Sequence, residues 1–201
     1  MTDVSRFSLS ANGKASNMRP LVITQNMTVD GSVETLTDWF DPNEDDREML
    51  AEIHRQSAAS DTLLLGRKTF EDMRGYWPEL EDDPTGIAEI LDKQTKYVVS
   101  STLAEPGWRN TVVLGSGWLE AVAELKESEG NEIGVTGSIS LCHALIQQGL
   151  VDEYRLFVYP AVQGFGRRLF PEGRSIPRLN LVGSKTFQNG VCLLTYRTRS
   201  R

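Results

Sequence analysis

Short runs of apolar and β-branched residues alternate along the chain with stretches in which apolar residues recur every three or four positions. Such runs are typical of buried strands, and the longer spacing is typical of helices that pack on one face. Five strands are predicted at residues 21–29, 61–65, 96–100, 111–114 and 153–159. A sixth run, at residues 132–136, precedes a turn of small residues and an amphipathic helix that reaches Gly149. This alternation predicts an α/β fold.

Helices are expected between the strands. Asp41, Pro42 and Glu44 offer an N-cap, a proline at the first helical position and an acid three residues after the cap, so a helix is predicted to start there, with Asp46 in its first turn. Helix-like stretches also follow Gly66 and Ser116, and the second is expected to turn Leu119, Val122, Ala123 and Leu125 inward. Residues 79–86 are predicted to be an acidic surface loop.

The end of the chain carries a hairpin signal, because Asn189-Gly190 separates two alternating segments. Together these elements predict a central, mostly parallel sheet with helices on both faces and a C-terminal antiparallel hairpin. At 201 residues the chain fits one domain, residues 19–201. Residues 1–18 are predicted to be a polar, poorly ordered lead-in.

Composition narrows the classes of function. The net charge is −7, with 28 acidic against 21 basic residues, which disfavours binding to nucleic acid and to anionic membranes. The chain has no apolar run of membrane-spanning length. Its two cysteines, Cys142 and Cys192, lack zinc-ligand spacing, so no metal site is expected, and reduced thiols fit a cytoplasmic protein.

The turn after residues 132–136 has the chemistry of a phosphate site. Gly134 and Gly137 let the backbone approach a ligand, and Ser138 and Ser140 bring hydroxyls to the free N–H groups of a helix start. The alternative is that Gly137 only makes the turn and Ser138 only caps the helix. The turn at residues 66–69 repeats the arrangement of strand, glycine and polar donors. The turn at residues 115–120 resembles half of a dinucleotide fingerprint, and Ser116 is interpreted as a helix cap.

Four segments occur in an order that resembles one family. The chain is similar to dihydrofolate-reductase-like proteins, in particular to the branch that contains the C-terminal reductase domain of bacterial riboflavin biosynthesis. The resemblance covers about residues 19–198. The segments that carry it are Asp30-Gly31, Leu-Leu-Gly-Arg-Lys-Thr-Phe at 64–70, Val-Val-Ser-Ser-Thr at 98–102 and Gly-Val-Thr-Gly-Ser-Ile-Ser at 134–140.

The resemblance implies an NADPH-dependent reductase whose cofactor lies across the carboxyl ends of the strands. Arg67 and Lys68 suit the 2′-phosphate of NADPH, because a guanidinium makes bidentate, charge-assisted contacts to phosphate. A solvated basic pair is the alternative for these two. The loop 100–102 is assigned to the adenosine end and the turn 136–140 to the pyrophosphate. The expected cofactor-binding residues are Gly66, Arg67, Lys68, Thr69, Ser100, Ser101, Thr102, Thr136, Gly137, Ser138, Ile139 and Ser140.

The substrate is expected to be a small pterin-like or pyrimidine-like heterocycle, or a carbonyl compound. Hydride reduction of a C=N or C=O carbon also needs a proton source. Asp38, between aromatic residues that could desolvate it, is the catalytic candidate, and Asp30, Trp39 and Trp77 are candidate substrate-binding residues. The Leu-Pro-Trp-type segment of true folate enzymes is absent, which argues against dihydrofolate itself as the substrate. The zinc deaminase pattern that usually accompanies the riboflavin branch is also absent, which indicates a stand-alone reductase domain.

Two alternatives stay open from the sequence. The same fold could hold a flavin or a deazaflavin in its nucleotide groove, or the chain could bind a nucleotide without turnover. The resemblance also implies a homodimer, which no residue pattern indicates on its own.

Overall fold

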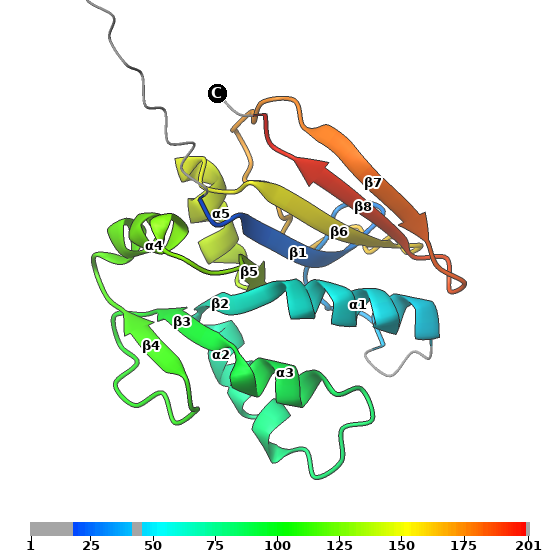
Figure 1. The fold of residues 1–201 in the computed structure, drawn as a ribbon. Helices are drawn as coiled ribbons and strands as arrows, with labels where there is room; N and C mark the ends of the chain where they lie inside the picture. Colours follow the sequence, from blue (N-terminus) through cyan, green and yellow to red (C-terminus); the bar gives the residue numbers. More distant parts are fainter. Residues whose placement is uncertain (1–17, 42–45, 200–201) are drawn as a thin grey trace, which may run out of the picture.

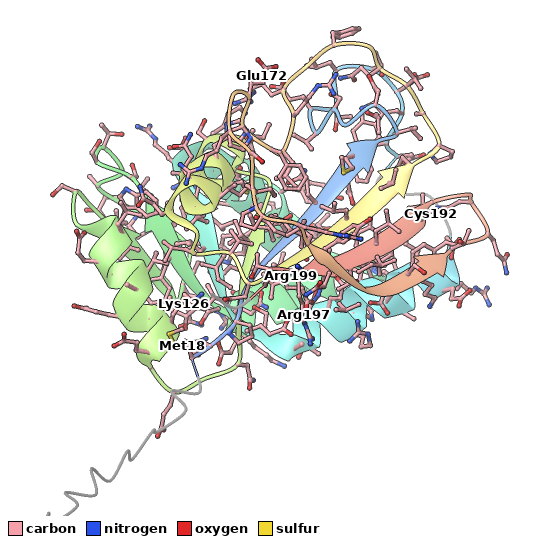
Figure 2. The ribbon with its side chains drawn as sticks, turned by 90° about the horizontal axis from the view of Figure 1, so that it is seen from above. Met18, Lys126, Glu172, Cys192, Arg197 and Arg199 are labelled. Atoms are coloured by element: carbon pink, nitrogen blue, oxygen red, sulfur yellow. The ribbon has the colours of Figure 1, made fainter. Side chains whose placement is uncertain are left out.

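The computed structural model describes residues 18–41 and 46–199. Most of the predicted lead-in, and Pro42 and Glu44 of the predicted helix start, therefore lie outside the described residues. The first described residues lie beside helix α4 (Trp118–Glu127), where the Arg19 N–H donates to the Lys126 carbonyl (2.7 Å). Figure 2 shows Met18 and Lys126 at the same end of the molecule.

A single eight-stranded sheet forms the centre of the molecule, in the order β4-β3-β2-β5-β1-β6-β8-β7 (Figure 1). The first six strands in this order are parallel, and β8 and β7 form the antiparallel hairpin at one edge. This arrangement confirms the predicted fold class. The strands are β1 (Leu21–Thr28), β2 (Ser60–Gly66), β3 (Thr95–Val99), β4 (Thr111–Leu114), β5 (Glu132–Thr136), β6 (Glu153–Tyr159), β7 (Asn180–Thr186) and β8 (Cys192–Arg197).

Helices cover both faces of the sheet because side chains alternate along each strand. On β1, Leu21 and Ile23 belong to the core shared with α4 and α5 (Ile139–Gln148). Val22 and Thr24 face the other side, which is covered by α1 (Arg47–Ala59), α2 (Arg67–Arg74) and α3 (Ile87–Lys93). Within the described residues, no helix is both long and apolar enough to cross a membrane.

Three local predictions are wrong. Asp46, and not Asp41, caps α1: its carboxylate accepts from the backbone N–H groups of Glu48 (3.0 Å) and Met49 (2.9 Å). Ser116 does not cap α4, whose N-cap residue is Gly117. Ala123 is exposed, whereas Val122 is buried and Leu125 packs against the core as predicted.

Candidate functional site

The turns singled out in the sequence come together at one edge of the sheet. Because β2, β3 and β5 are parallel, the segments that follow Gly66, Val99 and Thr136 all leave the sheet at its carboxyl edge. Backbone N–H groups of helix starts therefore point toward the same region as the hydroxyls of the loop after β3. This edge is where open α/β sheets bind ligands.

Two hydrogen bonds join the starts of α2 and α5. The Gly66 N–H donates to Ser138 Oγ (2.8 Å), and the Ser138 N–H donates to Thr69 Oγ1 (2.9 Å). Ser138 thus holds the neighbouring turn, and neither α2 nor α5 has a side-chain hydrogen bond from its N-cap residue. The two helix starts remain a place where an anion can satisfy the first backbone N–H groups.

Gly137 is required by the closeness of these turns. Its φ of +56° lies in the left-handed region, and a Cβ at this position would lie 2.9 Å from Thr69 Cγ2. From the sequence, Gly137 was interpreted as a residue that lets a ligand approach the backbone. The structure adds a second reason, which is that a side chain here would push the turns apart.

The basic residues at the start of α2 lie on the protein surface, and Arg67 lies beside the loop that follows β3. Arg67 forms an ion pair with Glu71 (2.8 Å) and donates to Thr102 Oγ1 (2.5 Å), while its side chain is 47% exposed. Lys68 pairs with Asp72 (2.8 Å) and is 86% exposed. Arg67 and Thr102, predicted to serve the same end of the cofactor, are therefore in contact.

Ser100 orders the loop after β3, because its Oγ accepts from the Thr102 N–H (3.2 Å) and the Leu103 N–H (3.0 Å). Ser101 and Thr102 are exposed. The hydroxyl of Ser100 is used mainly to shape the loop, so the other two residues remain to meet a ligand.

A cavity of about 430 Å³ lies under this edge, on the face of the sheet covered by α1, α2 and α3. Its size is in the range of small-molecule sites. Of the predicted cofactor residues, Thr69, Thr136 and Gly137 also line this cavity. The turns at residues 66–69, 100–102 and 136–140, here called the edge of turns, therefore meet the cavity at these three residues. Of the predicted substrate residues, Trp77 lines the cavity as well.

Asp30 lies outside the cavity lining and organises a pair of loops. Its carboxylate accepts from the Thr28 hydroxyl (2.6 Å) and from the backbone N–H groups of Gly164 (2.7 Å) and Gln163 (3.1 Å). These hydrogen bonds, the one from Thr28 above all, lower the pKa of Asp30 to about 2. Asp30 is therefore an anion at neutral pH, which makes it a loop anchor and a poor proton donor.

Trp39 and Asp38 also lie away from the cavity lining. The Trp39 ring packs edge-on against Tyr159 (5.2 Å between centroids), and its indole N–H donates to Gln163 Oε1 (3.1 Å). Asp38 is exposed, so burial by the neighbouring aromatic rings does not occur. The catalytic assignment of Asp38 stays a prediction that this geometry does not favour.

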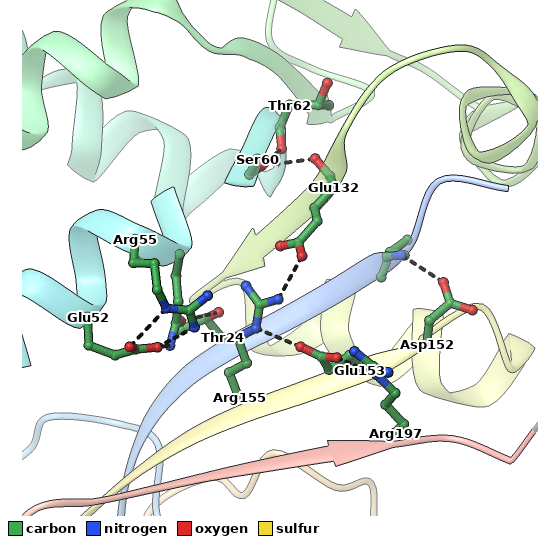
Figure 3. Close-up of polar contacts among 12 residues, drawn as sticks. Thr24, Glu52, Arg55, Ser60, Thr62, Glu132, Asp152, Glu153, Arg155 and Arg197 are labelled. Atoms are coloured by element: carbon green, nitrogen blue, oxygen red, sulfur yellow. Dashed lines mark hydrogen bonds and ion pairs between the residues drawn. The ribbon is translucent and has the colours of Figure 1, made fainter. Parts of the chain in front are cut away.

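Polar residues of the cavity were missed in the sequence. Thr24 and Asn26 of β1, Gln56 of α1 and Arg155 of β6 all line it. The sequence does carry a signal for two of these residues, because Thr24 and Asn26 interrupt the apolar pattern on one face of β1. Arg155 lies under the helices, where it donates to Glu153 (2.7 Å) and Glu132 (2.8 Å) (Figure 3).

Comparisons with known proteins point to one family. The chain matches the RibD C-terminal domain over residues 19–193. It is 32% identical over 185 residues to the uncharacterized protein YyaP of Bacillus subtilis (strain 168), covering 89% of this chain and 94% of that protein.

Solved structures share the fold at lower identity. One is a putative riboflavin biosynthesis protein from Shewanella sp. PV-4, with a TM-score of 0.67, 21% identity, and coverage of 90% of this chain and 99% of that one. Another is a pyrimidine reductase-like protein from Corynebacterium diphtheriae, with a TM-score of 0.64, 14% identity and coverage of 92% and 94%. Because the family match spans most of the sequence and the fold agrees, this chain belongs to the RibD C-terminal domain family.

Proposed function

We propose that this protein is an NADPH-dependent reductase of a small heterocyclic or carbonyl substrate. The observation that carries the proposal is the meeting of the two helix starts with the cavity at Thr69, Thr136 and Gly137. A dinucleotide along the edge of turns would bring its nicotinamide to the mouth of the cavity, where a substrate would lie.

The residues at the edge fit the parts of such a cofactor. Arg67 and Thr102 would hold the 2′-phosphate, which is the group that distinguishes NADPH from NADH. The uncapped starts of α2 and α5 would bind the pyrophosphate, with Thr69, Ile139 and Ser140 contributing N–H and hydroxyl groups. When bound, NADPH supplies a hydride.

The protein itself would position the substrate and exclude water from it. Glu132 is the one carboxylate among the described residues that line the cavity, and it is paired with Arg155. We therefore propose that the proton added with the hydride comes from water at the cavity mouth. As the resemblance implies, the enzyme would be a cytoplasmic homodimer. Light scattering of the purified protein would test the dimer.

The first test is a titration of the protein with NADPH and, separately, with NADH, followed by tryptophan fluorescence. Trp77 lines the cavity, so quenching of its emission and energy transfer to the nicotinamide should report binding. Tight binding of NADPH and weak binding of NADH are expected. Binding of neither would reject the proposal and favour a flavin or a deazaflavin in the groove. Binding of NADPH without oxidation by any pterin, pyrimidine or carbonyl compound would favour a binding module.

A further inference from the structure

The charged groups of the cavity limit what its substrate can be. Among the described residues that line it, Arg155 is the one cation and Glu132 the one anion. Arg155 starts on β6 beside Thr24 of β1, and its guanidinium reaches back toward the amino ends of the strands (Figure 3). It therefore lies at the side of the cavity toward the amino ends of the strands, here called the inner end, away from the turns proposed to hold the cofactor.

The charge of Arg155 is already balanced by two carboxylates. Its side chain is 9% exposed and donates to Glu132, which is 22% exposed, and to Glu153, which is 8% exposed. Burial by itself lowers the pKa of Arg155, but the hydrogen bonds and charges of Glu132 and Glu153 outweigh burial and raise the pKa above its ordinary value. The guanidinium is a structural ion, and its Nε and one of its terminal nitrogens donate to protein carboxylates.

The second carboxylate is balanced in turn. Glu153 also accepts from Arg197 of β8 (2.8 Å), whose side chain is 65% exposed. On α1, Glu52 pairs with Arg55, and the charges of Glu132 and Glu153 contribute to raising the pKa of Arg55 after its hydrogen bond to Glu52. Arg155 and Glu132 therefore belong to a group of three carboxylates and three guanidinium groups whose charges balance one another (Figure 3).

An anionic group has no cation left to meet there. A phosphate monoester that approached Arg155 would be repelled by Glu132 and Glu153, or would displace one of them and leave that carboxylate without its partner in a poorly solvated site. A cationic group that paired with Glu132 would be repelled by Arg155, or would displace Arg155 and leave that guanidinium without one of its partners. The free energy of binding at this end therefore favours an uncharged group.

The remaining walls fit a flat ring. Ile53, Met73, Trp77 and Phe157 supply apolar and aromatic surface. The side chains of Asn26 and Thr136 have no hydrogen-bond partner within the part of the chain that the structure describes, so their amide and hydroxyl groups are available to ring nitrogens and carbonyl oxygens. Both residues lie near the carboxyl ends of their strands, beside the turns.

We infer that the substrate is a flat, uncharged nitrogen heterocycle without a phosphate group, recognised by Asn26 and Thr136 and bounded at its inner end by the compensated Arg155. This inference rests on the proposed function, because it assigns the cavity to the substrate and the edge of turns to NADPH.

The experiment compares 6-hydroxymethyl-7,8-dihydropterin with the phosphate monoester of the same compound. Calorimetric titrations are run at pH 7.5, where the phosphate is mostly dianionic, with and without saturating NADPH. The unphosphorylated compound is expected to bind about tenfold or more tightly than its phosphate. Equal or tighter binding of the phosphate would overturn the inference, and so would failure of the unphosphorylated compound to bind.

A pair of variants tests the role of Arg155. Glu132→Gln removes one of its two carboxylates, so the preference for the unphosphorylated compound should shrink several-fold or reverse. Glu124→Gln, an exposed residue of α4, should keep the wild-type ratio. If Glu132→Gln does not fold, Glu153→Gln makes the same change of charge. An unchanged ratio in a folded variant would contradict the role given to Arg155.

The two proposals fail separately. Binding of the dihydropterin without any binding of NADPH would reject the proposed cofactor and keep the substrate class. Binding of NADPH together with tighter binding of the phosphate monoester would keep the proposed cofactor and reject the substrate class.

Discussion

Arg67 is the residue on which the distinction between NADPH and NADH should depend. Arg67→Ala is expected to weaken NADPH binding by about 1.5–3 kcal/mol, the value of a hydrogen bond to a charged group, and to leave NADH binding nearly unchanged. The half-exposed position of Arg67 and its ion pair with Glu71 place the loss near the lower end of this range. Fluorescence titration of both cofactors measures it.

Arg199→Ala is the matched control for this change. Arg199 is exposed and follows β8, which ends at the opposite edge of the sheet. Its removal should not alter either affinity. Equal losses of NADPH and NADH affinity in Arg67→Ala would remove the 2′-phosphate assignment.

Asp30 should make the stability of the protein depend on pH in a narrow acidic range. Its folded-state pKa of about 2 is below the ordinary value of 3.8, so the charged form stabilises the fold. That contribution is complete above about pH 4 and is lost as the pH falls toward 2. Asp30→Asn should therefore lower the melting temperature at pH 7, and the difference from wild type should shrink between about pH 4 and 2.

Thermal unfolding followed by circular dichroism at several pH values measures this difference. Asp82→Asn, a change of an exposed aspartate, is the control and should leave the melting temperature unchanged. A difference between wild type and Asp30→Asn that stays constant down to pH 2 would show that Asp30 is not an anchoring anion.

At the scale of elements, the contact between the starts of α2 and α5 should be measurable through Gly137. Gly137→Ala forces an alanine into the left-handed region, which costs about 1–2 kcal/mol, and also brings its Cβ against the Thr69 methyl. Gly149→Ala is a matched control, because Gly149 has a φ of +69° but a Cβ there would meet nothing within 4 Å. Gly137→Ala should therefore lower the free energy of unfolding more than Gly149→Ala does.

A second variant identifies the contact. Thr69→Ser removes the methyl group and keeps the hydroxyl that accepts from the Ser138 N–H. The extra cost of Gly137→Ala should fall in the Thr69→Ser background, with a coupling of about 0.5–3 kcal/mol in denaturant unfolding. Equal costs for Gly137→Ala and Gly149→Ala would mean that the two helix starts are not tightly packed.

The strands could be predicted from the sequence because their signal is local. β-branched and apolar runs, and the Asn189-Gly190 turn, report strand structure within a few residues. Helix α3 was missed, since its seven residues follow the acidic loop and are too few for a clear helical period. The start of α1 was misplaced because Asp41 and Asp46 both have the chemistry of an N-cap, and the sequence does not show which one accepts the N–H groups.

The candidate site was only partly predictable, for a related reason. The turns carry glycine and hydroxyl residues that stand out locally, so their residues could be named. The hydrogen bond from Gly66 to Ser138 joins residues 72 positions apart and follows only from the strand order. The cavity likewise combines Thr24, Gln56 and Arg155 from three elements, none of which forms a motif with its sequence neighbours.

At the scale of the whole molecule, NADPH should stabilise the folded chain, because it would join the segments after β2, β3 and β5 that only the folded sheet brings together. At a concentration 100 times its dissociation constant it should add about 2.7 kcal/mol to the free energy of unfolding. For a domain of this size that corresponds to a rise of about 5–10 °C in melting temperature.

The same thermal measurement separates the possible cofactors. NADH at an equal concentration should give a smaller rise, since it lacks the phosphate that Arg67 and Thr102 would hold. In Arg67→Ala the NADPH rise should drop to the NADH level. A rise with riboflavin 5′-phosphate or a deazaflavin, and none with NADPH, would instead assign the edge of turns to a flavin-type cofactor. The phosphate-binding helix starts would keep their role in that case, because both classes of cofactor carry phosphate.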